Sequence, residues 1–144
     1  GLRQLGGRVI GIDIAPNMIK EAEKKGWYDD LQVADMVSYL QIEQAQFDLV
    51  LAGDVLIYQG DLSLTLNRVA ARLKPGGWFV FNIELGEAAP YVLAESGRFK
   101  HHPDYIKEIV PDTCVIKATQ VVTLREQEQK SVQGQIFLVQ RCLN

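Results

Sequence analysis

Short apolar segments alternate with helix-forming segments along most of this sequence, and this alternation restricts the fold more than any other feature. Residues 8–14 and 47–52 are almost continuously apolar, which is typical of strands buried on both faces. Between them, residues 16–26 carry proline at the first helical position and glycine just past the end, which predicts a helix. Alternation of this kind favours an α/β fold whose doubly wound, mostly parallel sheet has helices on both faces.

The same reasoning predicts the elements further along the chain. Apolar residues that recur at helical spacing indicate helices, and short apolar runs indicate strands. The further elements expected are a strand within residues 31–40 that ends near Asp35, a helix from Asp61 to Lys74 that the Pro-Gly-Gly at 75–77 ends, a strand over residues 78–85, and helices over residues 87–94 and 103–110.

The C-terminal part of the sequence has a different pattern. Residues 114–126 and 132–142 are long β-type segments, and the polar sequence EQEQK lies between them without a helix. They are therefore expected to pair as an antiparallel hairpin on the edge of the parallel sheet. A hairpin folded about residue 128 would place Cys114 opposite Cys142. Both are expected to be free thiols, because two cysteines are too few for a disulfide scaffold.

Composition and charge narrow the functional classes. The 144 residues suit a single domain spanning residues 1–144, and the composition is that of an ordinary globular protein. A net charge of -3 speaks against a surface that binds nucleic acid or an anionic membrane. No apolar run approaches the roughly 20 residues that span a bilayer. The two cysteines lack metal-ligand spacing, so no metal site is expected, and we predict a cytoplasmic protein with reduced thiols.

Three acidic residues follow the predicted strands, at the end where open α/β sheets bind ligands. Asp13 closes the first of these strands, Asp35 the second and Asp54 the third. A carboxylate at the position of Asp13 can accept hydrogen bonds from both hydroxyls of a ribose. Asp35 can accept from an exocyclic amine such as that of adenine, while the N–H of Met36 meets a ring nitrogen. The alternative for each aspartate is a turn or helix-capping residue without a ligand.

Two adjacent histidines, His101 and His102, precede Pro103. Histidine is the usual proton acceptor near neutral pH, so either could serve as a general base. The alternative is that one of them precedes or caps the helix expected over residues 103–110.

Several segments together resemble class I S-adenosylmethionine-dependent methyltransferases. The second-strand motif of that family, in which an acidic residue holds the ribose, resembles VIGIDIAPNMIKEAEKKG, and the adenine-side motif resembles QVADM. The fourth-strand and fifth-strand regions are similar to FDLVLAGDVLIYQGDL and LKPGGWFVFNIE, and the terminal hairpin is similar to the last two strands of that fold. The resemblance extends over about residues 8–142. It is closest to bacterial methyltransferase domains often fused to tetratricopeptide repeats, which share a segment like SGRFKHHPDYI.

The resemblance implies S-adenosyl-L-methionine as the cofactor and methyl transfer to a small-molecule acceptor. The substrate side is expected to involve Asp54, Tyr58 or His102. The residues expected to contact the cofactor are Asp13, Ile14, Met18, Asp35, Met36 and Gly53.

The sequence also departs from this family. The first strand and the glycine-rich loop, which normally receives the methionyl part of the cofactor, have no counterpart. Gly1 leads directly into GLRQLGG, which resembles the end of a helix, so we expect the chain to continue upstream. If the sequence is complete as given, the strands on either side of the missing one have open edges, and a homo-oligomer is expected.

Two other functions are compatible with this pattern. The first is a non-catalytic interaction module that keeps the methyltransferase fold. The second is a fragment of an oxidoreductase that binds a nicotinamide dinucleotide, since that fold also has an acidic residue after its second strand. The terminal hairpin speaks against the second, because the dinucleotide-binding sheet is mostly parallel to its end.

Overall fold

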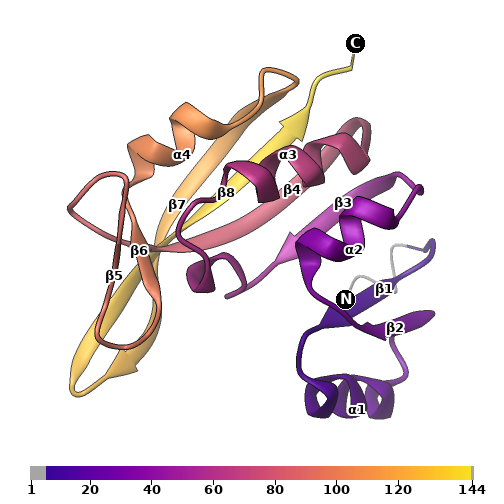
Figure 1. The fold of residues 1–144 in the computed structure, drawn as a ribbon, viewed down its shortest axis with the longest axis horizontal. Coiled ribbons are helices and arrows are strands. Elements are labelled where there is room, and N and C mark those ends of the chain that lie inside the picture. The colour runs from indigo at the N-terminus through magenta and orange to yellow at the C-terminus, as the bar shows by residue number, and fades with distance from the viewer. Residues whose placement is uncertain (1–5, 144) are drawn as a thin grey trace. The chain divides into compact units, whose positions relative to one another are not determined.

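The computed structural model describes residues 6–143 (Figure 1). The chain divides into two compact units, Gly1–Glu43 and Gln44–Asn144, and each is described by itself. The helix end expected near the N-terminus falls mainly on residues 1–5, which lie outside the described part. Among residues 6–143, no helix is long and apolar enough to span a membrane.

The first unit is a two-stranded parallel sheet with two helices. Its elements are β1 (Ile10–Asp13), α1 (Pro16–Lys25), β2 (Asp30–Val33) and α2 (Met36–Ile42). The predicted helix α1 is confirmed: it begins at Pro16 and ends before Gly26, whose left-handed φ of 67° allows its N–H to donate to Glu23 O. The parallel register, from Ile10 opposite Asp30 to Asp13 opposite Val33, brings the carboxyl ends of both strands to one edge.

The helix α2 is absent from the sequence-based expectation, which placed within residues 31–40 only a strand that ends near Asp35. That strand ends at Val33, and Asp35 then caps a helix by accepting a hydrogen bond from the N–H of Ser38 at 3.0 Å. An aspartate in this position satisfies a backbone donor that a helix leaves unpaired in its first turn. This capping bond accounts for the early end of the strand.

The second unit is a mixed sheet of six strands that carries three helical segments. The elements are β3 (Phe47–Ala52), η2 (Leu56–Tyr58), α3 (Ser63–Arg72), β4 (Leu73–Leu85), β5 (Tyr91–Leu93), β6 (Phe99–His101), α4 (Pro103–Ile109), β7 (Cys114–Gln127) and β8 (Lys130–Arg141). The strand order is β5-β6-β4-β8-β7, with β3 paired in parallel to β4. The predicted α/β class, with a parallel core and an antiparallel C-terminal hairpin, is confirmed.

The core of this unit is built on β4. Phe79, Phe81 and Ile83 alternate along the strand and are at most 2% exposed, which is the period of two that a strand face requires. The ring of Phe137 on β8 stacks on Phe81 with a centroid distance of 5.3 Å. Figure 1 shows α3 beside β4, and its buried Val69 belongs to the same core.

The C-terminal hairpin forms as predicted, between β7 and β8. Its tight turn is made by Glu128 and Gln129, which both have positive φ, as two-residue hairpin turns of the primed type require. Both cysteines are free, as expected. The predicted pairing of the cysteines is shifted by one position, so that Cys114 lies opposite Arg141. The pairing of β7 with β8 contains two irregularities, between Ile116 and Ala118 and between Thr123 and Arg125, whereas the prediction assumed a regular hairpin.

The helix predicted over residues 61–74 is shorter in the structure. It ends at Arg72, and the Pro-Gly-Gly at 75–77 lies within β4 rather than after a helix. The register between β3 and β4 changes there, from Phe47 opposite Leu73 to Leu49 opposite Trp78. Gly77 is required at this irregularity, because an added Cβ would lie 2.9 Å from Lys74 O and 3.0 Å from Phe47 O.

The helix predicted over residues 87–94 is wrong. This segment contains no helix and ends in the strand β5, which pairs with β6 in an antiparallel manner. Pro90 explains the difference, since proline lacks an N–H and disfavours helical geometry in the residue before it. The helix expected over residues 103–110 is confirmed as α4.

The prediction that the first and third strands are buried on both faces is also wrong. All four residues of β1 are half-buried, and Leu49 and Leu51 on β3 are 37% and 50% exposed. Among the described residues, β1 pairs only with β2 and β3 pairs only with β4, so each strand has one open edge. The expected oligomer remains a prediction.

Candidate functional site

Asp13 occupies the carboxyl end of β1, where the chain turns into α1. Its Oδ1 accepts a hydrogen bond from the N–H of Ala15 at 2.8 Å. This bond fixes the turn and uses one of the two carboxylate oxygens. The position and the remaining oxygen fit the predicted role of accepting from a ribose hydroxyl.

Two exposed apolar side chains accompany Asp13. Ile14 follows it directly and is 73% exposed, and Met18 in the first turns of α1 is 56% exposed. Asp13 and Met18 both line a shallow hollow that α1 shares with β1. Exposed apolar side chains beside a carboxylate suit a ligand with a flat ring and a polar sugar.

Asp35 and Met36 lie at the same edge of the two-stranded sheet. The N–H of Ala34 donates to Asp13 O at 3.0 Å, which ties the end of β2 to the end of β1. Asp35 Oδ2 accepts from both the N–H and the hydroxyl of Ser38, so the carboxylate serves as a helix cap. Met36 is the first residue of α2, and helical hydrogen bonding leaves its N–H without an intrahelical acceptor.

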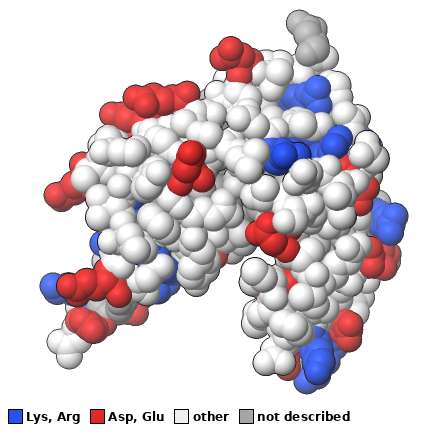
Figure 2. Space-filling model, viewed as in Figure 1, with Lys and Arg blue, Asp and Glu red and all other residues white. Residues whose placement is uncertain are grey.

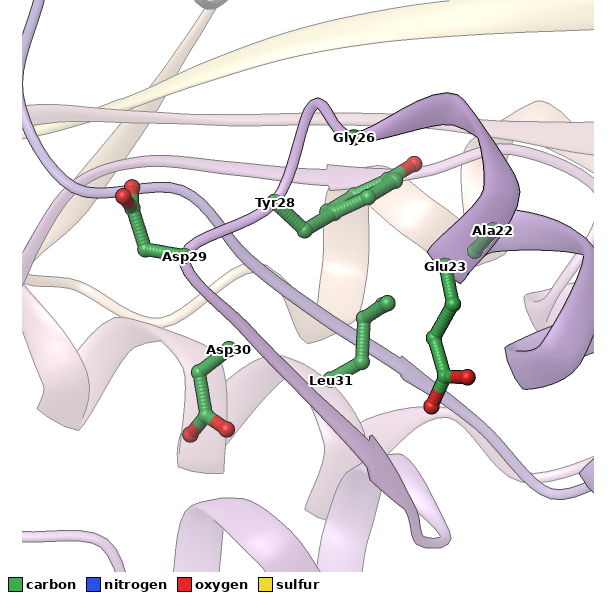
Figure 3. A pocket seen from close by; sticks show the side chains of 7 residues that line it. All are labelled: Ala22, Glu23, Gly26, Tyr28, Asp29, Asp30 and Leu31. Atoms are coloured by element: carbon green, nitrogen blue, oxygen red, sulfur yellow. The ribbon is translucent and has the colours of Figure 1, made fainter.

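Another hollow in this unit lies at the opposite end of the strands. Figure 3 shows its lining, where the ring of Tyr28 lies between α1 and the start of β2. Of its acidic residues, Asp29 accepts a hydrogen bond from the N–H of Val9 at 2.7 Å and so holds the start of β1. None of the residues predicted from the sequence to form the site lines this hollow.

In the second unit, Asp54 follows β3 and is held by polar side chains from two other strands. Its N–H donates to Asn82 Oδ1 at 2.8 Å, and its Oδ1 accepts from Asn82 Nδ2 at 2.9 Å. Arg125 Nη2 lies 3.1 Å from the same Oδ1. The backbone of Asp54 is left-handed, with a φ of 54°, and the reciprocal bonds with Asn82 stabilise this sparsely populated conformation.

The network continues to a carboxylate in the interior. Glu84 is 1% exposed, and its Oε2 accepts from Arg98 Nε at 2.6 Å and from Arg125 Nη1 at 2.7 Å. Burial opposes the charged form of Arg125, but the hydrogen bond to Glu84 and the charge of Asp54 outweigh it, so the pKa of Arg125 is raised. Two carboxylates and two guanidinium groups balance in charge, and the buried carboxylate of Glu84 is paired with both arginines.

Sequence reasoning missed Asn82, Glu84, Arg98 and Arg125. A signal was present: Asn82 and Glu84 stand two apart in the apolar run WFVFNIEL, so they share one face of a predicted strand. Polar residues on a buried face need partners. The sequence does not reveal the partners, because Arg125 lies 41 residues beyond Glu84.

The segment between Asp54 and α3 is anchored at its other end as well. Gly60 O lies 2.9 Å from His101 Nε2, and the hydroxyl of Tyr105 accepts from the N–H of Leu62 and donates to Asp61 Oδ1. Leu56 and Ile57 in η2 are fully buried, whereas Tyr58 is 65% exposed. The predicted acceptor-side residue Tyr58 is therefore presented to solvent by a segment that is fixed on both sides.

The remaining predicted site residues have simpler surroundings. Gly53 is exposed, and a Cβ added there would meet no atom within 4 Å. His102 is the N-cap of α4 and its Nδ1 accepts from the N–H of Asp104 at 3.1 Å, which is the alternative considered for it from the sequence. Asp54, Gly53 and Tyr58 belong to the second unit, and Asp13 and Asp35 to the first.

On one face of the molecule, neither sign of charge dominates (Figure 2). On the face drawn in Figure 2, Lys and Arg side chains lie in small groups between Asp and Glu side chains. Within residues 6–143, no group of three or more His, Cys, Asp or Glu is arranged to hold a metal ion. The predictions about nucleic acid and membrane partners stay predictions.

Comparison with known proteins identifies the family. Residues 1–81, more than half of the chain, match the family described as "Methyltransferase domain". A ubiquinone biosynthesis O-methyltransferase from Nitrobacter winogradskyi is 32% identical over 122 residues, which cover 76% of this chain and 45% of the relative. The chain spans less than half of the length of the curated relatives it matches.

Two solved structures show the same fold at low sequence identity. A SAM-dependent methyltransferase from Methanosarcina mazei has a TM-score of 0.72 at 19% identity, covering 99% of this chain and 86% of its own. The magnesium protoporphyrin IX methyltransferase from Synechocystis, solved with bound SAH, has a TM-score of 0.74 at 19% identity, covering 97% of this chain and 66% of its own. The chain belongs to the methyltransferase domain family, and its fold is that of the S-adenosylmethionine-dependent methyltransferases.

Proposed function

We propose that this protein transfers a methyl group from S-adenosylmethionine to an oxygen atom of a small-molecule acceptor. The observation that carries the proposal is the edge of the two-stranded sheet, where Asp13, Asp35 and Met36 follow two parallel strands. This is the end of an α/β sheet at which ligands bind. The family assignment supports methyl transfer as the reaction, and the ubiquinone biosynthesis O-methyltransferases among the relatives favour an oxygen atom as the methyl acceptor.

The residues at this edge fit the nucleoside half of the cofactor. Asp13 would accept hydrogen bonds from the ribose, and Asp35 and the N–H of Met36 would meet the adenine edge. The exposed side chains of Ile14 and Met18 would cover the adenine ring, and the exposed Gly53 would leave room for a ligand because an added Cβ there meets no atom within 4 Å. When bound, the cofactor supplies an electrophilic methyl group.

The acceptor side is assigned to the second unit. Asp54 and Tyr58 would bind and orient the acceptor, and the Asp54 carboxylate would take the proton that an attacking hydroxyl loses. His102 would contact the acceptor through the N–H of Nε2, because its Nδ1 caps α4. Orientation of this kind can lower the activation barrier by roughly 7–11 kcal/mol. The residues that position the acceptor are therefore expected to make the protein's largest contribution to the reaction rate. We also propose kinship with the bacterial methyltransferase domains fused to tetratricopeptide repeats, because GDVLIYQGDL and SGRFKHHPDYI resemble theirs.

Calorimetric titration separates this proposal from its alternatives. The purified protein is titrated with S-adenosylhomocysteine, with NAD⁺ and with NADH in separate experiments. Saturable binding of S-adenosylhomocysteine alone supports the methyltransferase, and binding of a nicotinamide dinucleotide alone would favour the oxidoreductase fragment. If neither ligand binds to the full-length protein, the result favours the non-catalytic interaction module.

A further inference from the structure

Asp54 is held more firmly than a residue in an exposed loop requires. Its left-handed backbone, its N–H and its Oδ1 are all constrained, by Asn82 and by Arg125, although its side chain remains 51% exposed. A non-glycine residue persists in this backbone region when its surroundings over-determine it. The constraint therefore fixes the direction in which an accessible carboxylate faces.

The constraint is transmitted from the interior by one side chain. Arg125 uses Nη1 for the buried Glu84 and Nη2 for Asp54, so the planar guanidinium links the two carboxylates. Arg98 also binds Glu84, which keeps the buried carboxylate paired independently of Arg125. The contacts of the Asp54 carboxylate with Asn82 and Arg125 both go to Oδ1, and among the described residues Oδ2 has no hydrogen-bond partner.

We propose that Arg125 is a positioning residue for the acceptor, an inference that rests on the proposed function. Together with Asn82 it holds Asp54 so that Oδ2 accepts a hydrogen bond from the hydroxyl group of the acceptor. The acceptor class is an aromatic alcohol, because Tyr58 follows four residues later on the anchored η2 turn with its ring exposed for stacking.

Asp54 orients the attacking oxygen and receives its proton. A hydroxyl that donates to a fixed carboxylate keeps both lone pairs of its oxygen directed away from that bond, and when this oxygen takes the methyl group its proton passes along the hydrogen bond to Oδ2. The attacking oxygen is thereby aligned, and misplacement of a reacting atom by about 1 Å can lower a rate on the order of a hundredfold. Arg125 touches neither reacting atom and acts only through Asp54.

The test compares three variants in the whole protein with catechol as the acceptor probe and labelled S-adenosylmethionine as the methyl donor. R125M is expected to lower kcat/KM for catechol about tenfold to a hundredfold while the affinity for S-adenosylhomocysteine stays unchanged. R125K keeps the charge but cannot bridge both carboxylates in the same way, so an intermediate effect is expected. R98M is the matched control, because it also removes an arginine from Glu84 but leaves the ion pair of Arg125 with Asp54.

Hydrogen–deuterium exchange supplies a readout that a general loss of stability would not reproduce. In R125M, exchange is expected to rise in the peptide covering residues 53–58, where the N–H of Asp54 is bonded to Asn82, and to stay unchanged in β8. An R125M protein with wild-type exchange and wild-type kinetics overturns the positioning role. A wild-type protein that binds S-adenosylhomocysteine but does not methylate catechol overturns the acceptor class, whereas failure to bind S-adenosylhomocysteine contradicts the proposed function itself.

Discussion

The Nε2 atom of His101 lies 2.9 Å from the carbonyl oxygen of Gly60, which stands 41 residues earlier in the chain. The histidine is fully buried, and its ring stacks on Tyr105 at a centroid distance of 6.1 Å. Because a carbonyl oxygen only accepts, Nε2 carries the proton and Nδ1 is the unprotonated nitrogen. Nδ1 is buried without a hydrogen-bond partner, so a second proton on this ring would be a buried and uncompensated charge.

This relationship predicts a loss of stability in mildly acidic solution. Burial lowers the pKa of His101 below its ordinary value of 6.5, although the hydrogen bond to Gly60 opposes the shift. The unfolded chain therefore takes up a proton near pH 6.5 before the folded protein does. The free energy of unfolding is expected to be highest above pH 6.5 and to fall as the pH decreases below it, as measured by urea denaturation.

The variant H101Q tests the origin of this slope. Glutamine can still donate to Gly60 O but does not titrate, so the dependence on pH is expected to weaken. The neighbouring variant H102Q keeps His101 and is expected to retain the slope. An unchanged slope in H101Q would show that other groups produce the pH dependence.

Asp13 is expected to dominate the affinity for the cofactor. In D13A, binding of S-adenosylhomocysteine should weaken by about 1.5–3 kcal/mol, the range for hydrogen bonds to a charged group. D13N keeps an oxygen that can accept from the N–H of Ala15. This variant therefore shows how much affinity is lost with the charge alone, while the turn after β1 is preserved. The exposed Asp48, paired with Lys74 on the surface, provides the control D48A. If calorimetry finds the same affinity for S-adenosylhomocysteine in D13A and D48A, Asp13 does not contact the cofactor.

Gly134 is expected to be essential for the packing of the hairpin on β4. A Cβ added there would collide with the side chain of Leu124 and lie 2.7 Å from Ile83 O. Since Ile83 belongs to the central strand, the backbone cannot easily yield, and G134A should lower the free energy of unfolding by about 1–3 kcal/mol. G53A, where an added Cβ meets open space, should change it by less than about 0.5 kcal/mol. Equal denaturation midpoints for the two variants would contradict this packing.

The two cysteines are expected to differ in reactivity. Cys114 is buried, and burial raises the pKa of its thiol, whereas Cys142 is half-buried beyond the end of β8. A higher pKa leaves less thiolate, so Cys142 should react with a thiol reagent at pH 8 well before Cys114. Mass spectrometry of the labelled protein and of C142S follows the two sites. Faster labelling of Cys114 would show that β7 opens at its start.

The sequence by itself determined the elements whose cause is local. Proline at position 16 and glycine at 26 delimit α1, and the long β-type segments with a polar turn specify the hairpin. The order of strands and helices was enough to predict the α/β class, and Asp13 at the end of β1 marks the edge at which we propose that the cofactor binds. These features depend on backbone preferences that act within a few residues.

Only the tertiary structure decided the features that join distant segments. Pro75 and its two glycines look like a helix end, yet the pairing of β4 with β3 draws them into a strand. The strands β5 and β6 form because they pair with each other and β6 pairs with β4, which overrides weak local preference. The link between Glu84, Arg125 and Asp54 depends on where β4, β7 and the end of β3 meet, and no local pattern encodes a contact between residues so far apart in the chain.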